Sequence, residues 1–144
     1  MQYRKALELD PSFFFAQWGL GWTDVEAGRF SEASAELEKA KAMDSRPFVA
    51  GFLGYAHAAA GNRGRAQAII AELNQMSSLR FVSPFCTAIV YLGLDDKPRA
   101  LEGLDKAYGV RSQWLTMLKV DRIFEPLRSE PLFIELLKKV GLNN

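Results

Sequence analysis

Apolar and small residues recur along this chain at helical spacing, and the whole pattern returns with a stride of 33 or 34 residues. Three series share this stride and agree in phase. They are small residues at Gly21, Gly54 and Ala88, turn residues at Gly28, Gly61 and Asp95, and alanines at Ala33, Ala66 and Ala100. A fourth series runs through Ala6, Ala40, Leu73 and Ala107. A period of this length is typical of stacked helical hairpins, in which each unit buries its apolar face against its neighbours.

The apolar spacing predicts two helices in each unit. In the first unit we expect helices over 12–27 and 32–43, with Ser31 as the N-cap of the second. The next unit should hold helices over 48–60 and 64–76, with Pro47 in the first turn, where its missing N–H costs little. The third unit should begin at Ser83-Pro84, and its second helix should open near Asp95-Asp96.

The period is lost after Gly109, and the remaining apolar residues predict a different end unit. We expect a short helix over 112–120, one turn over 121–127 and a last helix opened by Glu130-Pro131. A repeat array needs such a divergent element to cover its apolar end. The sequence therefore predicts a single all-α domain over 1–144, with the end of a partial repeat at 1–11, repeats at 14–46, 47–80 and 81–111, and capping helices at 112–144.

The first residues have the pattern of the last turns of a helix. Tyr3, Ala6, Leu7 and Leu9 are followed by Asp10-Pro11, and proline cannot continue a helix. No partner helix precedes them in the sequence. Three explanations stay open: the chain is the C-terminal piece of a longer protein, another surface covers this end, or the segment is a frayed cap.

Composition limits the classes of partner. Of 144 residues 49% are hydrophobic and 12% aromatic, well above a disordered segment, so we expect a folded core. Eighteen basic and seventeen acidic residues leave a formal charge of +1, which gives no field for nucleic acid or anionic lipid. No apolar run approaches the roughly 20 residues of a membrane span, and one cysteine excludes an internal disulfide. A cytoplasmic protein is the default expectation.

Residues that could carry chemistry are few and isolated. His57 is the only histidine and lies among alanines, so we expect a structural or groove-lining role for it. Cys86 has no second thiol, and Gly19-x-Gly21 follows no strand, as a dinucleotide site would require. Asp95-Asp96 and Asp121 are better explained as helix starts than as metal ligands. We therefore expect no enzyme, no cofactor and no metal site.

Large apolar side chains form one stripe on the first helix of each unit. Every stripe has i, i+3, i+7 or i, i+4, i+7 spacing, which places its members on one helix face. The stripes are Phe15, Trp18 and Trp22, then Phe48, Phe52 and Tyr55, then Val82, Phe85 and Ile89. Side by side they would make a patch large enough to mark an interaction site, with Trp and Tyr as anchors. The alternative is that the C-terminal helices or an upstream domain cover these stripes as ordinary core.

The repeated pattern resembles the tetratricopeptide repeat, a 34-residue helical hairpin. Leu20-Gly21, Gly28-x-Phe30, Ala33, Leu37 and Ala40 fit its motif in the first unit, and Pro47, Leu53-Gly54, Gly61 and Ala66 fit it in the second. The third unit fits less well: Ala88, Tyr91, Ala100, Leu104 and Ala107 agree, but Thr87 replaces the leucine and Asp95 the turn glycine. The leading segment 5–11 resembles the end of one further unit, so the likeness covers roughly residues 3–108.

The resemblance implies a right-handed superhelix whose first helices line a concave groove, so that the three stripes face inward. Family members that bind chaperone C-termini grip a carboxylate with basic and amide side chains. The positions of this chain that fit those sites are Trp18, Trp22, Phe52, Val82 and Cys86, none of which can do so. Residues 114–141 look like the ending of bacterial tetratricopeptide proteins in which the array follows a regulatory domain.

Three hypotheses follow. The first is a protein-interaction module that holds an apolar helix or extended peptide of a partner by aromatic burial. The second is a structural or self-association domain, a homodimer or the C-terminal part of a larger regulatory protein, with its groove filled. The third, from the enzyme class, is a regulatory tail of a catalytic domain that lies outside this sequence.

Overall fold

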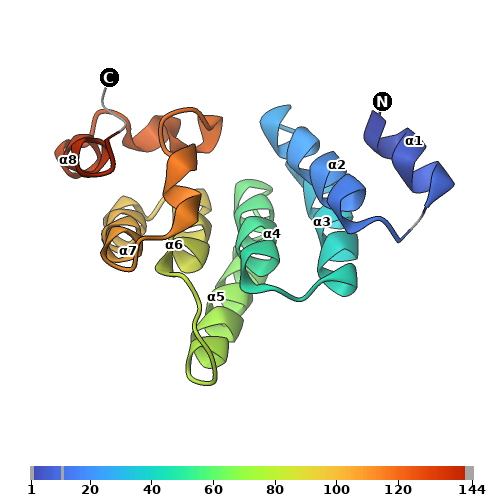
Figure 1. The fold of residues 1–144 in the computed structure, drawn as a ribbon, viewed down its shortest axis with the longest axis horizontal. Helices are drawn as coiled ribbons and strands as arrows, with labels where there is room; N and C mark the ends of the chain where they lie inside the picture. Colours follow the sequence, from blue (N-terminus) through green and yellow to red (C-terminus); the bar gives the residue numbers. More distant parts are fainter. Residues whose placement is uncertain (1, 11, 142–144) are drawn as a thin grey trace.

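The structure is a computed structural model that describes residues 2–10 and 12–141, and within these ranges it contains helices and no strand (Figure 1). Six helices form three antiparallel hairpins: α2 (Phe14–Glu26) with α3 (Phe30–Met43), α4 (Pro47–Ala59) with α5 (Arg63–Ser77), and α6 (Pro84–Gly93) with α7 (Lys97–Gly109). Helix α1 (Gln2–Leu9) precedes them, and the 3-10 helices η1 (Gln113–Met117) and η2 (Arg122–Leu127) and helix α8 (Pro131–Lys139) follow. The helices follow one another along an arc, with α1 at one end and α8 at the other.

The turns inside the three hairpins are copies of one another. Gly28, Gly61 and Asp95 all have positive φ, at 78°, 89° and 61°. The residue after each of them donates its N–H to a carbonyl five residues back: Arg29 to Asp24, Asn62 to His57 and Asp96 to Tyr91, at 2.8, 2.8 and 2.9 Å. Glycine is favoured at such a position because it has no Cβ to clash, and Asp tolerates it better than most residues. The period of 33 or 34 residues in the sequence therefore corresponds to a repeated backbone conformation at the turns. The prediction of repeated helical hairpins is confirmed.

The residues that recur with this stride pack between helices, within a hairpin or between neighbouring hairpins. Ala33, Ala66 and Ala100 are fully buried. A Cβ added at Gly21 would lie 2.7 Å from Leu37, and one added at Gly54 would lie 2.6 Å from Val90. Small side chains at these positions allow helices to approach to native packing distance.

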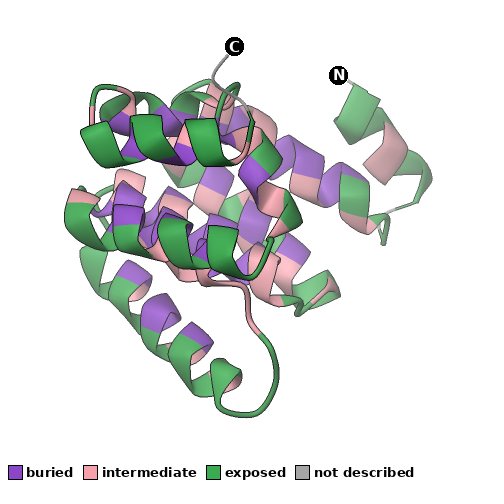
Figure 2. Ribbon diagram, turned by 60° about the vertical axis from the view of Figure 1, so that its left-hand side comes forward, coloured by how far each residue is buried: buried purple, intermediate pink, exposed green. Residues whose placement is uncertain are grey.

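Helix α1 is attached more loosely than the rest. None of its residues is buried, and it packs against α2, where the ring of Tyr3 lies over Gly19 (Figure 2). The predicted helical ending of this segment is confirmed for residues 2–9. Pro11, which was expected to end the helix, lies outside the described residues.

The last segment closes the other end of the array. Phe124, Leu127 and Phe133 are fully buried, and the rings of Phe124 and Phe133 stack at 6.1 Å between centroids. The carboxylate of Asp121 accepts from the N–H of Ile123 and starts η2, as expected. The first element of this segment differs from the prediction: it is a five-residue 3-10 helix, Gln113–Met117, rather than a helix over 112–120.

Three further helix starts agree with the sequence and one differs. Pro47 is the first residue of α4, the hydroxyl of Ser83 accepts from the N–H of Phe85, and the carboxylate of Asp96 accepts from the N–H of Arg99. Ser31 is not an N-cap, because α3 begins at Phe30 and Ser31 lies within its first turn.

No helix in the described part of the chain is both long and apolar enough to cross a membrane.

Candidate functional site

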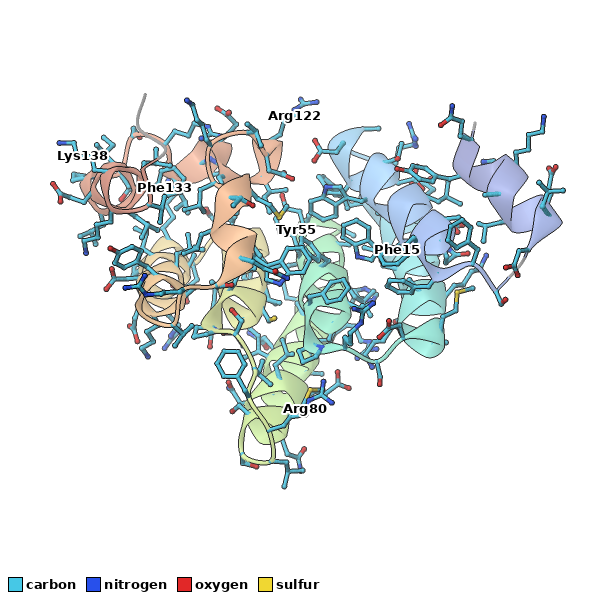
Figure 3. All side chains as sticks on the ribbon, viewed as in Figure 1. Phe15, Tyr55, Arg80, Arg122, Phe133 and Lys138 are labelled. Atoms are coloured by element: carbon cyan, nitrogen blue, oxygen red, sulfur yellow. The ribbon has the colours of Figure 1, made fainter. Side chains whose placement is uncertain are left out.

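A cluster of aromatic rings joins α2 to α4, and we call it the aromatic seam (Figure 3). Its members are Phe14, Trp18, Trp22, Phe48, Phe52 and Tyr55. Trp18 and Trp22 stack at 6.0 Å between centroids, and Phe52 packs edge-on against both, at 5.4 and 4.6 Å. Edge-to-face pairs of this kind contribute about 0.5–1.5 kcal/mol each beyond the burial of their area.

The stripe on α2 starts one residue earlier than the sequence suggested. Phe14 packs edge-on against Phe48 at 6.3 Å, whereas Phe15 is 62% exposed. Phe14, Trp18 and Trp22 are four residues apart, and side chains at that spacing lie above one another on a helix. The i, i+3, i+7 alternative through Phe15 fits the same sequence, and only the angle at which α2 meets α4 distinguishes the two.

The C-terminal half of the expected groove is filled by the chain itself. Trp114, in η1, lies 5.0 Å from Phe48, 5.6 Å from Phe52 and 6.2 Å from Phe85, measured between ring centroids. Phe52 and Phe85, which Trp114 contacts, and Ile89 are all no more than 1% exposed. The expectation that these three line an open groove is corrected: they are core. Trp114 was not among the predicted site residues, because it lies outside the repeats. The 33- or 34-residue period does not predict where that segment packs.

The remaining predicted site residues keep part of their surface. Trp18, Trp22, Phe48, Tyr55 and Val82 are half-buried, and Phe15 is exposed. The Nε1–H of Trp18 is buried and has no acceptor among the described residues. A buried donor without a partner lowers stability by about 1–3 kcal/mol. The described residues therefore leave one hydrogen-bond donor of the seam, the indole N–H of Trp18, without an acceptor.

Charged groups border the seam at both ends. At one end the guanidinium of Arg46, paired with Asp44 at 2.6 Å, lies over the rings of Phe14 and Phe48 at 5.6 and 4.9 Å. At the other end is a cleft of about 460 Å³ between α2, α4 and η2, with Tyr55 and Arg122 in its lining. The guanidinium of Arg122 donates to the backbone oxygen of Glu26 at 3.1 Å.

Two carboxyl groups meet at this cleft. Burial raises the pKa of Glu26, and the charge of Asp121 and a hydrogen bond between the two carboxyl groups raise it further, against the opposing effect of Arg122 and Trp22. Burial, with the same two negative charges, raises the pKa of Tyr55 to about 12. The Glu26–Asp121 pair therefore links the first hairpin to the C-terminal segment and depends on protonation.

The two isolated residues considered for chemistry are held inside the structure. His57 lies at the α3–α4 junction, with Nε2 3.2 Å from Glu38 Oε2 and Nδ1 3.3 Å from Asn62 Nδ2. Burial raises the pKa of the Cys86 thiol to about 12, so it is protonated and unreactive at neutral pH. Among residues 2–10 and 12–141 no group of three or more His, Cys, Asp and Glu side chains could hold a metal ion.

The chain was compared with protein-family models, with curated proteins and with solved structures, and none of the three comparisons gave a match. The class that the fold defines is a helical-repeat protein built from three similar hairpins. Function therefore has to be inferred from the chemistry of the seam and its surroundings.

Proposed function

We propose that this chain is a protein-interaction module that binds an apolar helix or extended segment of a partner on the α2 side of the aromatic seam. The single observation that carries the proposal is the exposure of Phe15, 62%, beside the half-buried Trp18, Trp22 and Phe48. Aromatic side chains that remain partly exposed to solvent in the free protein often serve as anchors of interfaces. Affinity would come from burying these rings, since the net charge is only +1.

The architecture proposed with this function is a tetratricopeptide-like array. Equivalent turn bonds and positive φ values in the three hairpins support it, as do the motif residues. In such an array the hairpins wind as a right-handed superhelix and the first helix of each hairpin faces the concave side. Here η1 occupies the part of that side formed by α4 and α6, so the proposed binding surface is confined to α2 and the adjoining face of α4.

Phe15 and Phe81 form a matched pair of variants for the test. Both are phenylalanines with largely exposed side chains, 62% and 72%, but Phe81 lies in the α5–α6 connection, away from the seam. Peptides would be selected from a displayed library of amphipathic 16-residue sequences, and the dissociation constant of the best peptide measured by fluorescence anisotropy. We expect Phe15→Ser to weaken binding roughly 30-fold, which corresponds to an anchor worth about 2 kcal/mol, and Phe81→Ser to leave it unchanged.

Equal affinity for the wild type and Phe15→Ser, or a library that enriches no peptide, would remove the proposal. The second candidate is then the structural one, favoured by the insertion of Trp114 between Phe48, Phe52 and Phe85. In that case the exposed edge formed by α1 and α2 would associate with a second copy. Light scattering across a dilution series would show a dimer that persists, and Phe15→Ser would convert it to a monomer.

A further inference from the structure

A second concave site lies where α7 ends, η1 begins and α8 ends. It is a cavity of about 410 Å³, a size typical of small-molecule sites. Its lining consists of Tyr108, Gly109, Arg111, Ser112, Leu115, Thr116, Lys139 and Val140. These residues provide two cationic side chains, three hydroxyl groups and an apolar floor, and no carboxylate.

Arg111 occupies a backbone position at which the chain otherwise places residues that tolerate left-handed geometry. Helix ends followed by positive φ occur at Gly28, Gly61, Asp95, Arg111 and Gly141, and the φ of Arg111 is 55°. A residue with a Cβ is disfavoured there because the Cβ crowds the backbone, and glycine would avoid this conformational cost. Residues held in such conformations cluster at functional sites, so Arg111 is a candidate binding residue.

The guanidinium of Arg111 is free for a ligand. Arg111 is exposed, and its side chain forms no hydrogen bond or ion pair within the described part of the chain. Its backbone N–H donates to Tyr108, which fixes the residue at the cavity rim, while the next residue, Ser112, donates to Ala107 at 2.9 Å.

Lys139 brings a second positive charge to the cavity from α8. Its Nζ lies 5.7 Å from the centre of the Tyr108 ring and 3.4 Å from the carboxylate of Asp105, which is outside the lining. That ion pair is exposed and hence weak, so a ligand with a higher charge density can compete for Lys139. The hydroxyl of Ser112 accepts from Ser83 at 3.0 Å and keeps its own proton to donate.

We propose that this cavity binds a small phosphate monoester carried on an apolar or aromatic group. A phosphate dianion matches two cations, and Arg donates to it through its planar fork while Lys acts as a compact charge. The apolar group would lie on Leu115, Val140 and the ring of Tyr108. The site is separate from the aromatic seam and does not depend on the function proposed for it.

The test uses phenyl phosphate, inorganic phosphate and benzoate as probes, titrated into the ¹⁵N-labelled full chain. We expect phenyl phosphate to shift the amide signals of residues 108–116 and 140, to bind more tightly than inorganic phosphate, and to bind more tightly than benzoate. Arg111→Gly should raise its dissociation constant by at least about tenfold, the value of one hydrogen bond to a charged group. Lys139→Gln should weaken it as well, and Arg80→Gln, at an exposed arginine on the α5–α6 connection, should not.

Arg111→Gly is suited to this purpose because glycine accepts the backbone geometry, so its melting temperature should equal or exceed that of the wild type. If that variant fails to fold, Arg111→Asn also tolerates a positive φ and replaces it in the titration. Shifts confined to other residues, equal affinity for Arg111→Gly and the wild type, or a preference for benzoate would each overturn the proposal.

Discussion

The junctions of α4 with α6 and with α2 differ in how close the helices come. Toward α6 the backbones touch: a Cβ on Gly51 would lie 2.8 Å from the carbonyl oxygen of Cys86, and one on Gly93 would lie 3.0 Å from that of Tyr55. Toward α2 the contact is made by rings, with Trp22 and Phe52 4.6 Å apart between centroids. Small residues thus join α4 tightly to α6, and large rings join α4 to α2.

This difference decides which apolar side chains become core. At the tight junction Phe85 and Ile89 are sealed between helices and under η1. At the ring-filled junction Phe52 is buried, but Trp18, Trp22 and Phe48 remain partly exposed. The same kind of stripe is therefore interior in one hairpin and surface in another.

The largest effect should come from Phe52, which takes part in both junctions. It is fully buried among Trp18, Trp22, Phe85 and Trp114, so Phe52→Ala should lower the free energy of unfolding by about 3–5 kcal/mol. Trp22→Ala, at a half-buried ring, should cost less than half as much. Urea unfolding followed by circular dichroism measures both, with Leu37→Ala as the core reference. If Phe52→Ala lowered the free energy of unfolding no more than Trp22→Ala does, the seam would be exposed to solvent on both sides.

Overpacking tests the tight junction directly. Gly54→Leu places side-chain atoms against Val90 and Ile69, and it should cost about 1–3 kcal/mol. The matched control is Gly64→Leu in the first turn of α5, where an added Cβ meets nothing within 4 Å. That control should be neutral or stabilising, because leucine is the better helix former. Equal melting temperatures for the two variants would contradict close packing of α4 on α6.

Removing the side chain that fills the groove should make the two junctions more alike. Trp114→Ala leaves Phe48, Phe52 and Phe85 without their shared neighbour, and we expect a loss of about 1–3 kcal/mol, since Trp114 is only half-buried. Binding of an apolar fluorescent dye should rise at the same time. Unchanged dye fluorescence with lowered stability would indicate that the segment collapses to cover the rings again.

The smallest effect concerns the carboxyl pair at the edge of the seam. Because the pKa of Glu26 is raised in the folded state, the folded protein binds more protons than the unfolded chain just above the ordinary value of 4.5. Stability should therefore fall as the pH rises through this interval, and Glu26→Gln should flatten that part of the profile. Glu26 is only partly buried, so we expect a difference well under 1 kcal/mol at pH 7. Thermal unfolding from pH 4 to 7 measures it, with Glu32→Gln on α3 as the control.

The repeated part of the fold was accessible from the sequence because its signals are local. Turn residues at Gly28, Gly61 and Asp95 specify backbone geometry within a few bonds, and Ala33, Ala66 and Ala100 report the buried side of a helix through its own periodicity. Helix bounds agreed to within a few residues for the same reason. The N-cap at Ser31 failed because Arg29 ends the turn two residues earlier, so that Phe30 already begins the helix.

The candidate site was predicted only in part. Its residue types and helices were accessible from spacing, but the choice of Phe14 over Phe15 on the inner face depends on how α2 is rotated against α4. The insertion of Trp114 depends on a contact between segments more than 60 residues apart, which no periodic signal encodes. Arg111 was not singled out, because a cavity formed by α7, η1 and α8 has no counterpart in any one stretch of sequence.

By itself the sequence determined an all-helical chain of repeated hairpins, since helical periodicity and turn chemistry act between neighbours and do not need the rest of the molecule. The tertiary structure decided which apolar stripe is covered and which stays exposed, because burial depends on the distance between helices and on the path of the C-terminal segment. Glycines bring α4 and α6 together, rings set the contact between α2 and α4, and Trp114 fills what remains between them. These are properties of packed surfaces that come from different parts of the chain.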